Sequence, residues 1–235
     1  MRLLAIESSG LTASVALLED DKIIGEYSTN FKKTHSQTLL PMMDEVVKMT
    51  GISMDTLDAI VISGGPGSFT GLRIGAATAK GLGLALDIPL VNVPTVDGLA
   101  YNLYGTDRVI CPIMDARRQQ VYTGLYRFEG DHFHVVSEQM ATGIADIVEK
   151  INEMGEPVIF LGDGVPVFRS YILEHATTDV IFAPAHLNYQ RAGALAALGK
   201  QYFLDGKTET ADEHVPDYLR LSQAEREMLE KNKQK

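Results

Sequence analysis

Apolar residues at the start of the chain fall into three short runs, at residues 3–6, 14–18 and 22–27. Turn-prone segments separate them, Ser8-Ser9-Gly10 before the second run and Glu19-Asp20-Asp21 before the third. Such short spacing between apolar runs is typical of hairpins, because a few turn residues suffice to reverse the chain. The pattern therefore predicts an antiparallel meander of three strands.

Helical spacing replaces this pattern in the next segment. Apolar residues recur at the interval of one helix face over residues 37–49, and Gly51 stands where that helix would end. Thr34 and Gln37 fit a capping box at its start. The next predicted elements are a strand at 59–63, a helix at 70–86 and a strand at 89–93.

Parts of this order repeat in the second half of the chain, where three apolar runs again precede a helical pattern. The predicted elements are strands at 109–114, 121–127, 132–136, 157–161 and 180–182, with helices at 144–152, 165–174 and 190–204. Ser222 and Glu225 fit the cap of a last helix at 223–232. Three antiparallel strands followed by strand–helix crossovers imply a mixed sheet flanked by helices. We therefore predict an α/β protein of two lobes, residues 1–104 and 105–217, with a C-terminal helix within 218–235 joined to the first lobe.

A glycine-rich string, Ser63-Gly64-Gly65-Pro66-Gly67-Ser68-Phe69-Thr70-Gly71, links the strand at 59–63 to the helix at 70–86. The string lacks the Gly-Lys-Ser/Thr ending of a P-loop, so it is interpreted as a close-packing turn. Each glycine inside a helix costs roughly 1 kcal/mol relative to alanine, and close approach of another backbone would offset that cost. Either the chain's own sheet or a partner helix could make this approach. Small residues recur every fourth position along the helix, at Gly71, Gly75, Ala79 and Gly83.

Charge balance and cysteine count narrow the class of protein. The formal net charge is -10, whereas a protein that grips nucleic acid unaided usually has a basic face. One cysteine, Cys111, excludes an internal disulfide framework and lies in the apolar run at 109–114 as a small core residue. No apolar run reaches the ~18 residues of a membrane span. We therefore expect a cytoplasmic protein that does not cross a membrane and meets nucleic acid, if at all, only through other proteins.

Four strings in this sequence carry a resemblance to a known family. They are Ile6-Glu7-Ser8-Ser9, His35-Ser36-Gln37, Gly65-Pro66-Gly67-Ser68-Phe69-Thr70-Gly71-Leu72-Arg73 and Asp115-Ala116-Arg117-Arg118. Together they resemble the TsaB (YeaZ) family, and the repeated element order resembles the superfold of actin, sugar kinases and the Hsp70 ATPase. The resemblance implies two actin-like, ribonuclease H-like lobes, each with a mixed sheet of the five-stranded type flanked by helices.

The same resemblance implies a role in forming threonylcarbamoyladenosine beside the anticodon of tRNA. The expected role is that of a non-catalytic subunit, which binds and activates the catalytic TsaD together with the ATPase TsaE. A homodimer is expected where TsaD is absent. No tightly bound cofactor is expected, and ATP or ADP would bind only at a site shared within the complex. The open alternative is an enzyme in its own right, either a stand-alone actin-like ATPase or a metallopeptidase.

Departures from TsaD favour the non-catalytic role. TsaD-like proteins hold a metal with two histidines four residues apart, and Thr95 and Leu99 stand at the matching positions here. Leucine cannot ligate a metal and threonine is a poor ligand for iron or zinc, so no residue is assigned to a metal. Actin-like ATPases also place an aspartate in the first hairpin, where this chain has Leu11. We therefore assign no catalytic residue.

Two sets of candidate contact residues follow from the resemblance. In this family the helices of the first lobe pair with TsaD, which makes the expected partner interface His35, Leu39, Met42, Met43, Val46, Gly71, Arg73, Gly75, Ala79 and Gly83. The candidates for nucleotide or partner contact are Ser8, Ser9, Arg117, Arg118, Gly162 and Gly164. Each of these has a structural alternative: turn residues for the serines, an ion pair with Asp115 for the arginines, and a strand-to-helix turn for the glycines.

Overall fold

The computed structural model describes residues 1–31 and 34–220, which form two five-stranded sheets of the same topology. The strand orders are β3-β2-β1-β4-β5 and β10-β9-β6-β7-β8. In each sheet three strands form an antiparallel meander. A fourth strand pairs in parallel with the first strand of the meander, and a fifth pairs in parallel with the fourth. The strands are β1 (Arg2–Glu7), β2 (Ala13–Glu19), β3 (Lys22–Thr29), β4 (Ala59–Ser63), β5 (Leu90–Val93), β6 (Val109–Asp115), β7 (Gln120–Glu129), β8 (His132–Gly143), β9 (Val158–Leu161) and β10 (Val180–Phe182). The predicted pair of mixed sheets is confirmed.

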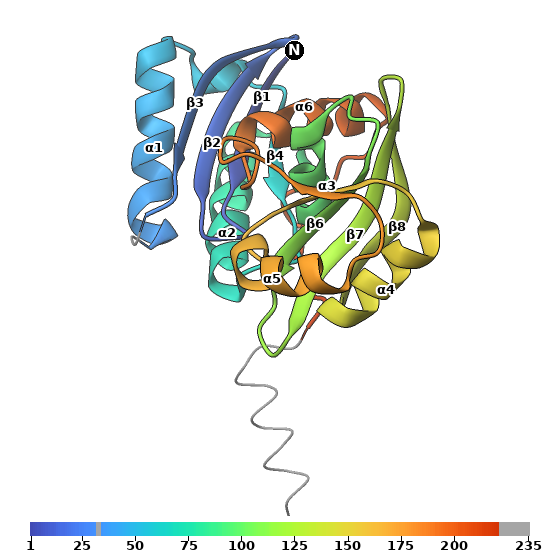
Figure 1. Cartoon of the computed structure of the whole chain (residues 1–235). Coiled ribbons are helices and arrows are strands. Elements are labelled where there is room, and N and C mark those ends of the chain that lie inside the picture. Colours follow the sequence, from blue (N-terminus) through green and yellow to red (C-terminus); the bar gives the residue numbers. More distant parts are fainter. Residues whose placement is uncertain (32–33, 221–235) are drawn as a thin grey trace, which may run out of the picture.

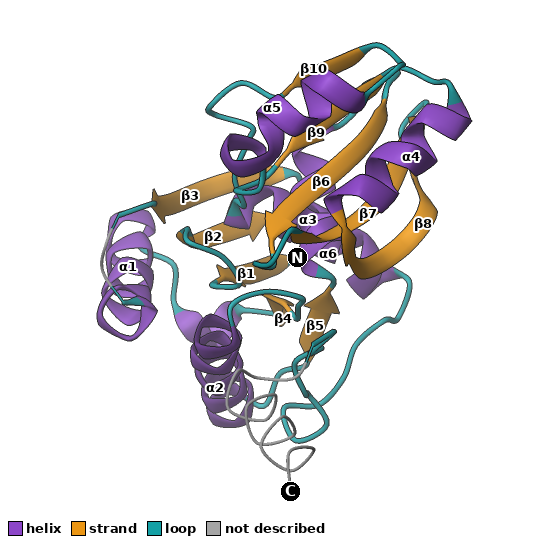
Figure 2. Cartoon of the chain, turned by 60° about the horizontal axis from the view of Figure 1, so that its bottom comes forward, coloured by secondary structure: helices purple, strands orange, loops and turns teal. Residues whose placement is uncertain are grey.

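Three layers of helices alternate with the two sheets (Figures 1 and 2). One pair covers the outer face of the first sheet, a second pair lies between the sheets, and a third covers the outer face of the second sheet. In that order the helices are α1 (His35–Thr50) with α2 (Phe69–Leu86), α3 (Thr95–Ala100) with α6 (Ala192–Leu204), and α4 (Ile144–Met154) with α5 (Val165–His175). Short 3-10 turns lie at Met54–Thr56 and Tyr101–Leu103.

Side-chain alternation on β1 explains this layering. Successive side chains of a strand point to opposite faces, so a strand covered on both faces is apolar throughout. Leu4 and Ile6 belong to the core beneath α1 and α2, whereas Leu3 and Ala5 belong to the core around α3 and α6. The second of these cores also contains Ile110 and Tyr126 of the second sheet. The two lobes therefore share one hydrophobic core along the layer between the sheets.

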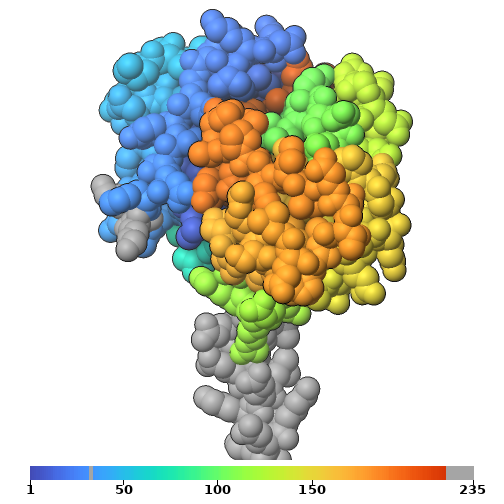
Figure 3. All heavy atoms as spheres, in the orientation of Figure 1, coloured from blue at the N-terminus to red at the C-terminus, as the bar shows by residue number. Residues whose placement is uncertain are grey.

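Helix α6 belongs by packing to the first sheet, although the sequence places it in the second half of the chain. It contacts β1, β2, β4 and β5. A Cβ at Gly199 would come within 2.3 Å of Val61 Cγ1, so α6 lies very close to this sheet. The segment before it also meets the first lobe, as the touching orange and blue surfaces in Figure 3 show. There Arg191 Nη2 lies 2.6 Å from Glu26 Oε2. The lobe boundaries at 104 and 217 stay predictions, but the chain returns to the first sheet well before residue 217.

Several local predictions need correction. Thr34 is the N-cap of α1 but makes no side-chain capping bond within the described residues, and its hydroxyl lies 3.2 Å from Ser36 Oγ instead. Strand β8 continues to Gly143, beyond the predicted end at residue 136. Helix α3 was not predicted, because six residues are too few to show a helical period. The predicted helix at 223–232 lies outside the described residues.

Among the helices that the structure describes, none has both the length and the apolar character that crossing a membrane requires.

Candidate functional site: the cleft between the lobes

A cleft of about 640 Å³ lies between the lobes, where central strands of both sheets end. The first lobe lines it with Ser9–Leu11 after β1 and with Gly67–Leu72 at the start of α2. The second lobe adds Met114–Arg117 at the end of β6, and residues 217–220 complete the wall. Carboxyl ends of parallel strands are the usual ligand position in α/β folds, so this cleft is the candidate functional site.

The turn after β1 is closed by its own side chains. Glu7 is 2% exposed, and its Oε1 accepts hydrogen bonds from the Ser9 amide, at 2.7 Å, and from the Ser9 hydroxyl. Ser8 Oγ donates to the carbonyl oxygen of Gly71 at 2.9 Å. Burial raises the pKa of Glu7 to about 7, and the bonds from Ser9 only partly offset this. Ser9 thus closes the turn and Ser8 ties it to α2, and a contact of either serine with nucleotide stays a prediction.

Close packing on this turn explains Gly67, just before α2, and Gly71 and Gly75 in the first half of α2. A Cβ at Gly67 would lie 2.2 Å from the carbonyl oxygen of Ser9, and one at Gly71 would lie 2.1 Å from that of Ser8. A Cβ at Gly75 would lie 2.3 Å from Ser8 Oγ. Atoms cannot approach so closely, so a larger residue would push α2 away from β1. The predicted close approach exists, and it is made by the chain's own first turn.

The expected partner interface therefore needs correction. Gly71, Gly75, Ala79 and Gly83 are buried against the first lobe's own turn and sheet. On α1 the expected apolar contacts are 1–5% exposed and lie in the core with Ala76 and Ile62. A partner cannot reach these eight buried residues while the lobe keeps this packing. The residues of α1 that no longer belong to the expected interface are Leu39, Met42, Met43 and Val46.

His35 and Arg73, the other two expected interface residues, lie where a second molecule could reach them. His35 is half-buried at the cleft, and its Nε2 lies 2.8 Å from the carbonyl oxygen of Gly10. Its Nδ1 is buried without a hydrogen-bond partner among the described residues. Arg73 is exposed, and its guanidinium lies 4.0 Å from the centre of the Phe69 ring. Their role at an interface stays a prediction.

The turn between β6 and β7 has an unusual backbone. Arg117, Arg118 and Gln119 all have positive φ, at 65°, 57° and 59°, and this region costs roughly 1–2 kcal/mol for each residue that has a side chain. Asp115 compensates for part of that cost. Its Oδ1 accepts from the Arg117 amide at 2.9 Å, and its Oδ2 lies 3.2 Å from Arg117 Nη1. Arg117 thus forms the ion pair with Asp115 that was one of its two predicted roles, although its side chain is 86% exposed. Arg118 is exposed beside it.

Close packing also accounts for the two glycines after β9. Gly162 has a φ of 111°, and a Cβ there would lie 2.1 Å from the carbonyl oxygen of Ile113. Gly164 donates its amide to the same carbonyl oxygen at 3.0 Å. These contacts fit the strand-to-helix alternative, and a contact with nucleotide stays a prediction. Asp163, between them, faces the cleft and accepts from the Asp115 amide at 3.0 Å, and burial raises its pKa.

Three backbone amides at the cleft already have hydrogen-bond partners within the chain. Phosphate cradles need backbone amides that point at the ligand. Here the amides of Ser9, Asp115 and Arg117 already donate to carboxylates of the chain. Asp115, Asp163 and Asp217 line the cleft together with Arg117 and Arg220, so both signs of charge are present there.

The positions that match the TsaD histidines have structural roles here. Thr95 is fully buried, and its hydroxyl oxygen accepts from the Gly65 amide at 3.2 Å. Leu99 is 1% exposed in the shared core. Over residues 1–31 and 34–220, no group of three or more His, Cys, Asp and Glu side chains is arranged to hold a metal ion.

Sequence reasoning missed two buried acids, Glu7 and Asp97. Asp97 of α3 accepts hydrogen bonds from the hydroxyls of Tyr126, at 2.7 Å, and Tyr202, at 3.2 Å. Burial raises the pKa of Asp97 to about 6. The signal in the sequence is an acid within an otherwise apolar stretch, since such a residue needs buried partners.

Two sheets of one topology, joined by a shared core and separated by a cleft at their strand ends, define a two-lobed α/β protein whose lobes repeat one mixed-sheet fold. The family model described as TsaD, tRNA N6-adenosine threonylcarbamoyltransferase, matches residues 22–228. The tRNA threonylcarbamoyladenosine biosynthesis protein TsaB of Bacillus subtilis is 39% identical over 99% of this chain and 100% of its own length. The chain belongs to the TsaB family, also called YeaZ.

More distant relatives point to the same family. The TsaB protein of Escherichia coli is 29% identical over 94% of this chain and 95% of its own length. The solved structure of YeaZ from Pseudomonas aeruginosa has a TM-score of 0.76 and 25% identity, covering 93% of this chain and 99% of that one.

Proposed function

We propose that this chain is an accessory subunit in the biosynthesis of threonylcarbamoyladenosine in tRNA, and that it binds and activates a TsaD-type catalytic subunit. The relatives and the matching family model are named for this modification. Activation requires that the chain bind the active conformation of its partner more tightly than other conformations. The observation that carries the proposal is an exposed face of α2 that is lined with small residues and lies beside the exposed side of α1.

This docking face consists of Ala77, Gly81, Leu84 and Ala85 on α2, and Leu40 and Met49 are exposed on opposite sides of the neighbouring α1. On α2 the small residues recur every fourth position, on the side away from the sheet. A Cβ at Gly81 would meet no atom within 4 Å. The two helices lie next to each other on the outside of the first lobe (Figure 2). A partner helix could therefore approach the backbone of α2 closely.

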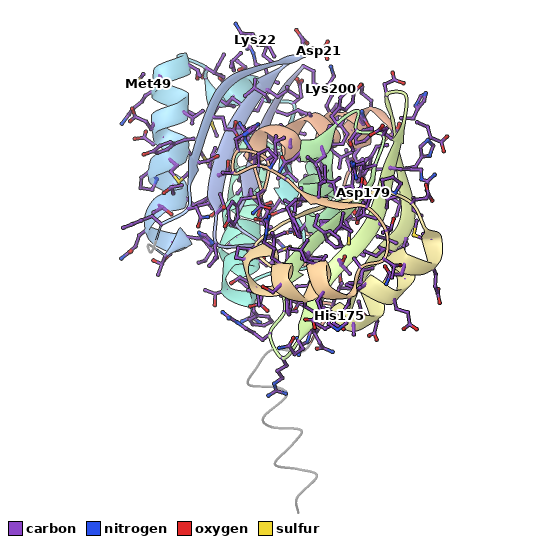
Figure 4. All side chains as sticks on the ribbon, in the orientation of Figure 1. Asp21, Lys22, Met49, His175, Asp179 and Lys200 are labelled. Atoms are coloured by element: carbon purple, nitrogen blue, oxygen red, sulfur yellow. The ribbon has the colours of Figure 1, made fainter. Side chains whose placement is uncertain are left out.

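Exposed apolar side chains on both helices provide area for association. Leu40, Met49 and Leu84 are 57%, 79% and 60% exposed, and Met49 points outward from α1 in Figure 4. Burying such side chains is favourable in proportion to the apolar area removed from water. A second copy of this chain could use the same face where TsaD is absent.

A non-catalytic role is supported by how the chain uses its polar groups. The cleft serines, their neighbouring acid and the residue at the first histidine position all bond within the chain. ATP or ADP would then bind at a site shared with TsaD and the ATPase TsaE. The net charge of -10 disfavours direct binding to the tRNA backbone, so tRNA contact falls to the partners.

Size-exclusion chromatography with light scattering tests the docking face. The chain is run by itself and with TsaD of the same organism, as wild type and as Gly81→Arg. Arginine has a better helix propensity than glycine and meets open space here, so the variant should fold normally. We expect wild type to form a mixed complex and Gly81→Arg to lose it, because the long side chain blocks close approach. Ala145→Arg, at an exposed position on α4, is the matched control and should bind as wild type does.

Other results would reject the proposal. Equal binding by wild type and Gly81→Arg would place the interface elsewhere. Absence of any complex, with or without ATP, would favour an independent activity, and ATP hydrolysis by the purified chain would then support the stand-alone ATPase.

A further inference from the structure

The chain returns to the first lobe after α6 and is held there by main-chain bonds. The amide of Leu90 donates to the carbonyl oxygen of Glu209 at 2.8 Å, and the amide of Glu209 donates back at 3.0 Å. His214 is 1% exposed, its Nδ1 lies 2.6 Å from Glu209 Oε1, and its carbonyl oxygen accepts from Lys80 Nζ at 3.0 Å. These bonds direct the following residues, 217–220, to the cleft.

One end of this four-residue strap, 217–220, is attached to the first lobe. The amide of Asp217 donates to the carbonyl oxygen of Gly64 at 2.6 Å. Gly65 has a φ of 118°, and a Cβ there would lie 2.2 Å from the carbonyl oxygen of Asp217. The rings of Tyr218 and Phe69 lie 4.7 Å apart. Two residues of the glycine-rich string, Gly65 and Phe69, are thus fitted to the strap.

The other attachments of the strap are to the second lobe. Gln139 Nε2, on β8, donates to Asp217 Oδ2 at 2.7 Å. The guanidinium of Arg220 donates to the carbonyl oxygen of Ala116, in the turn between β6 and β7. In Figure 1 the red end of the described chain lies beside this turn. Asp217 therefore bonds to both lobes, and Arg220 adds a second bond to the second lobe.

We propose that residues 217–220 are a latch that holds the two lobes closed at the cleft, and that its release opens the cleft. The shared core around α3 and α6 joins the lobes along the layer between the sheets and acts as the hinge side. The latch contacts on the second lobe are two side-chain hydrogen bonds, one of them exposed and the other part-buried. Contacts of this kind open more readily than core strands do, so the latch can release while both lobes stay folded.

Distance measurements between the lobes test this proposal in the full chain. Nitroxide labels are attached at Gln37→Cys on α1 and Ser170→Cys on α5, both exposed positions. The native Cys111 will not be labelled, because it is fully buried and burial raises the pKa of its thiol to about 12. Pulsed electron–electron double resonance then measures the distribution of distances between the two labels.

Two variants weaken the latch, one at its contact with each lobe. Tyr218→Ala removes the ring contact with Phe69, with Tyr218→Phe as the matched control that keeps a ring. Gln139→Ala removes the bond from β8 without altering the strap. We expect both alanine variants to lengthen and broaden the distance distribution, while Tyr218→Phe matches wild type. One lost hydrogen bond should raise the open fraction by up to about tenfold.

Hydrogen exchange separates latch release from general loosening. Peptides from residues 8–12 and 114–119 should exchange faster in both alanine variants, while β1 peptides keep the wild-type rate. An unchanged distance distribution in both variants would overturn the proposal. A lower melting temperature with equally faster exchange throughout the chain would also overturn it, since the contacts of residues 217–220 would then stabilise the whole fold and not the closed cleft.

Discussion

Glu7 shows how one buried group can couple the cleft to pH. Its carboxyl group is 2% exposed, and its pKa is raised by burial from 4.5 to about 7. The folded state therefore binds this proton more tightly than the unfolded state does. The stability that this provides is fully present below pH 4.5 and is lost as pH rises through about 7.

We predict that Glu7→Gln removes this part of the pH dependence. The amide oxygen of glutamine can still accept from Ser9, but it carries no charge to desolvate. Relative to wild type, the free energy of unfolding of the variant should rise by about 3 kcal/mol between pH 4.5 and pH 8. Urea unfolding over this pH range measures it. Glu45→Gln, at an exposed position on α1, is the control, and a pH-independent difference for Glu7→Gln would contradict the prediction.

At the scale of elements, α2 carries small residues on two opposite faces. The inner face meets the turn after β1, and the outer face contains Gly81 with open space around it. The four-residue period predicts both faces equally well, because it reports only which residues share a side of the helix. Contact with Ser8 and Ser9, which are distant in sequence, decides which face is buried.

We predict opposite effects for alanine at the two faces. Gly71→Ala places a Cβ 2.1 Å from the carbonyl oxygen of Ser8, so the backbone must shift, at a cost of roughly 1–3 kcal/mol. Gly81→Ala meets no atom within 4 Å and should stabilise the helix by up to about 1 kcal/mol. Denaturant unfolding of both variants measures the pair. A gain in stability for Gly71→Ala would show that the inner face is not closely packed.

On the scale of the whole molecule, Asp97 joins the lobes through buried polar contacts. The carboxylate on α3 accepts from Tyr126 of the second sheet and from Tyr202 of α6, which packs on the first sheet. Burial raises its pKa from 3.8 to about 6. The stability from this shift is complete below pH 3.8 and is lost as pH rises through about 6.

We predict that Tyr126→Phe destabilises the chain more at pH 8 than at pH 5. At pH 8 Asp97 is ionised, and a hydrogen bond to a charged group is worth roughly 1.5–3 kcal/mol, compared with about 1 kcal/mol for a neutral one. Unfolding measurements at both pH values test this. In an Asp97→Asn background the cost of Tyr126→Phe should no longer depend on pH, and an equal cost at both pH values in the native background would refute the argument.

The sequence by itself determined the order of elements, the two mixed sheets and the need for close packing on α2. These features depend on alternation, helical period and glycine content, which are local in the chain. Tertiary structure decided which segment packs against the glycines of α2, because the spacing of Gly71 and Gly75 cannot distinguish the chain's own turn from a partner. It also placed α6 on the first sheet, Asp97 between two tyrosines and Asp217 against Gly65. Those contacts join residues far apart in sequence, and no local pattern encodes them.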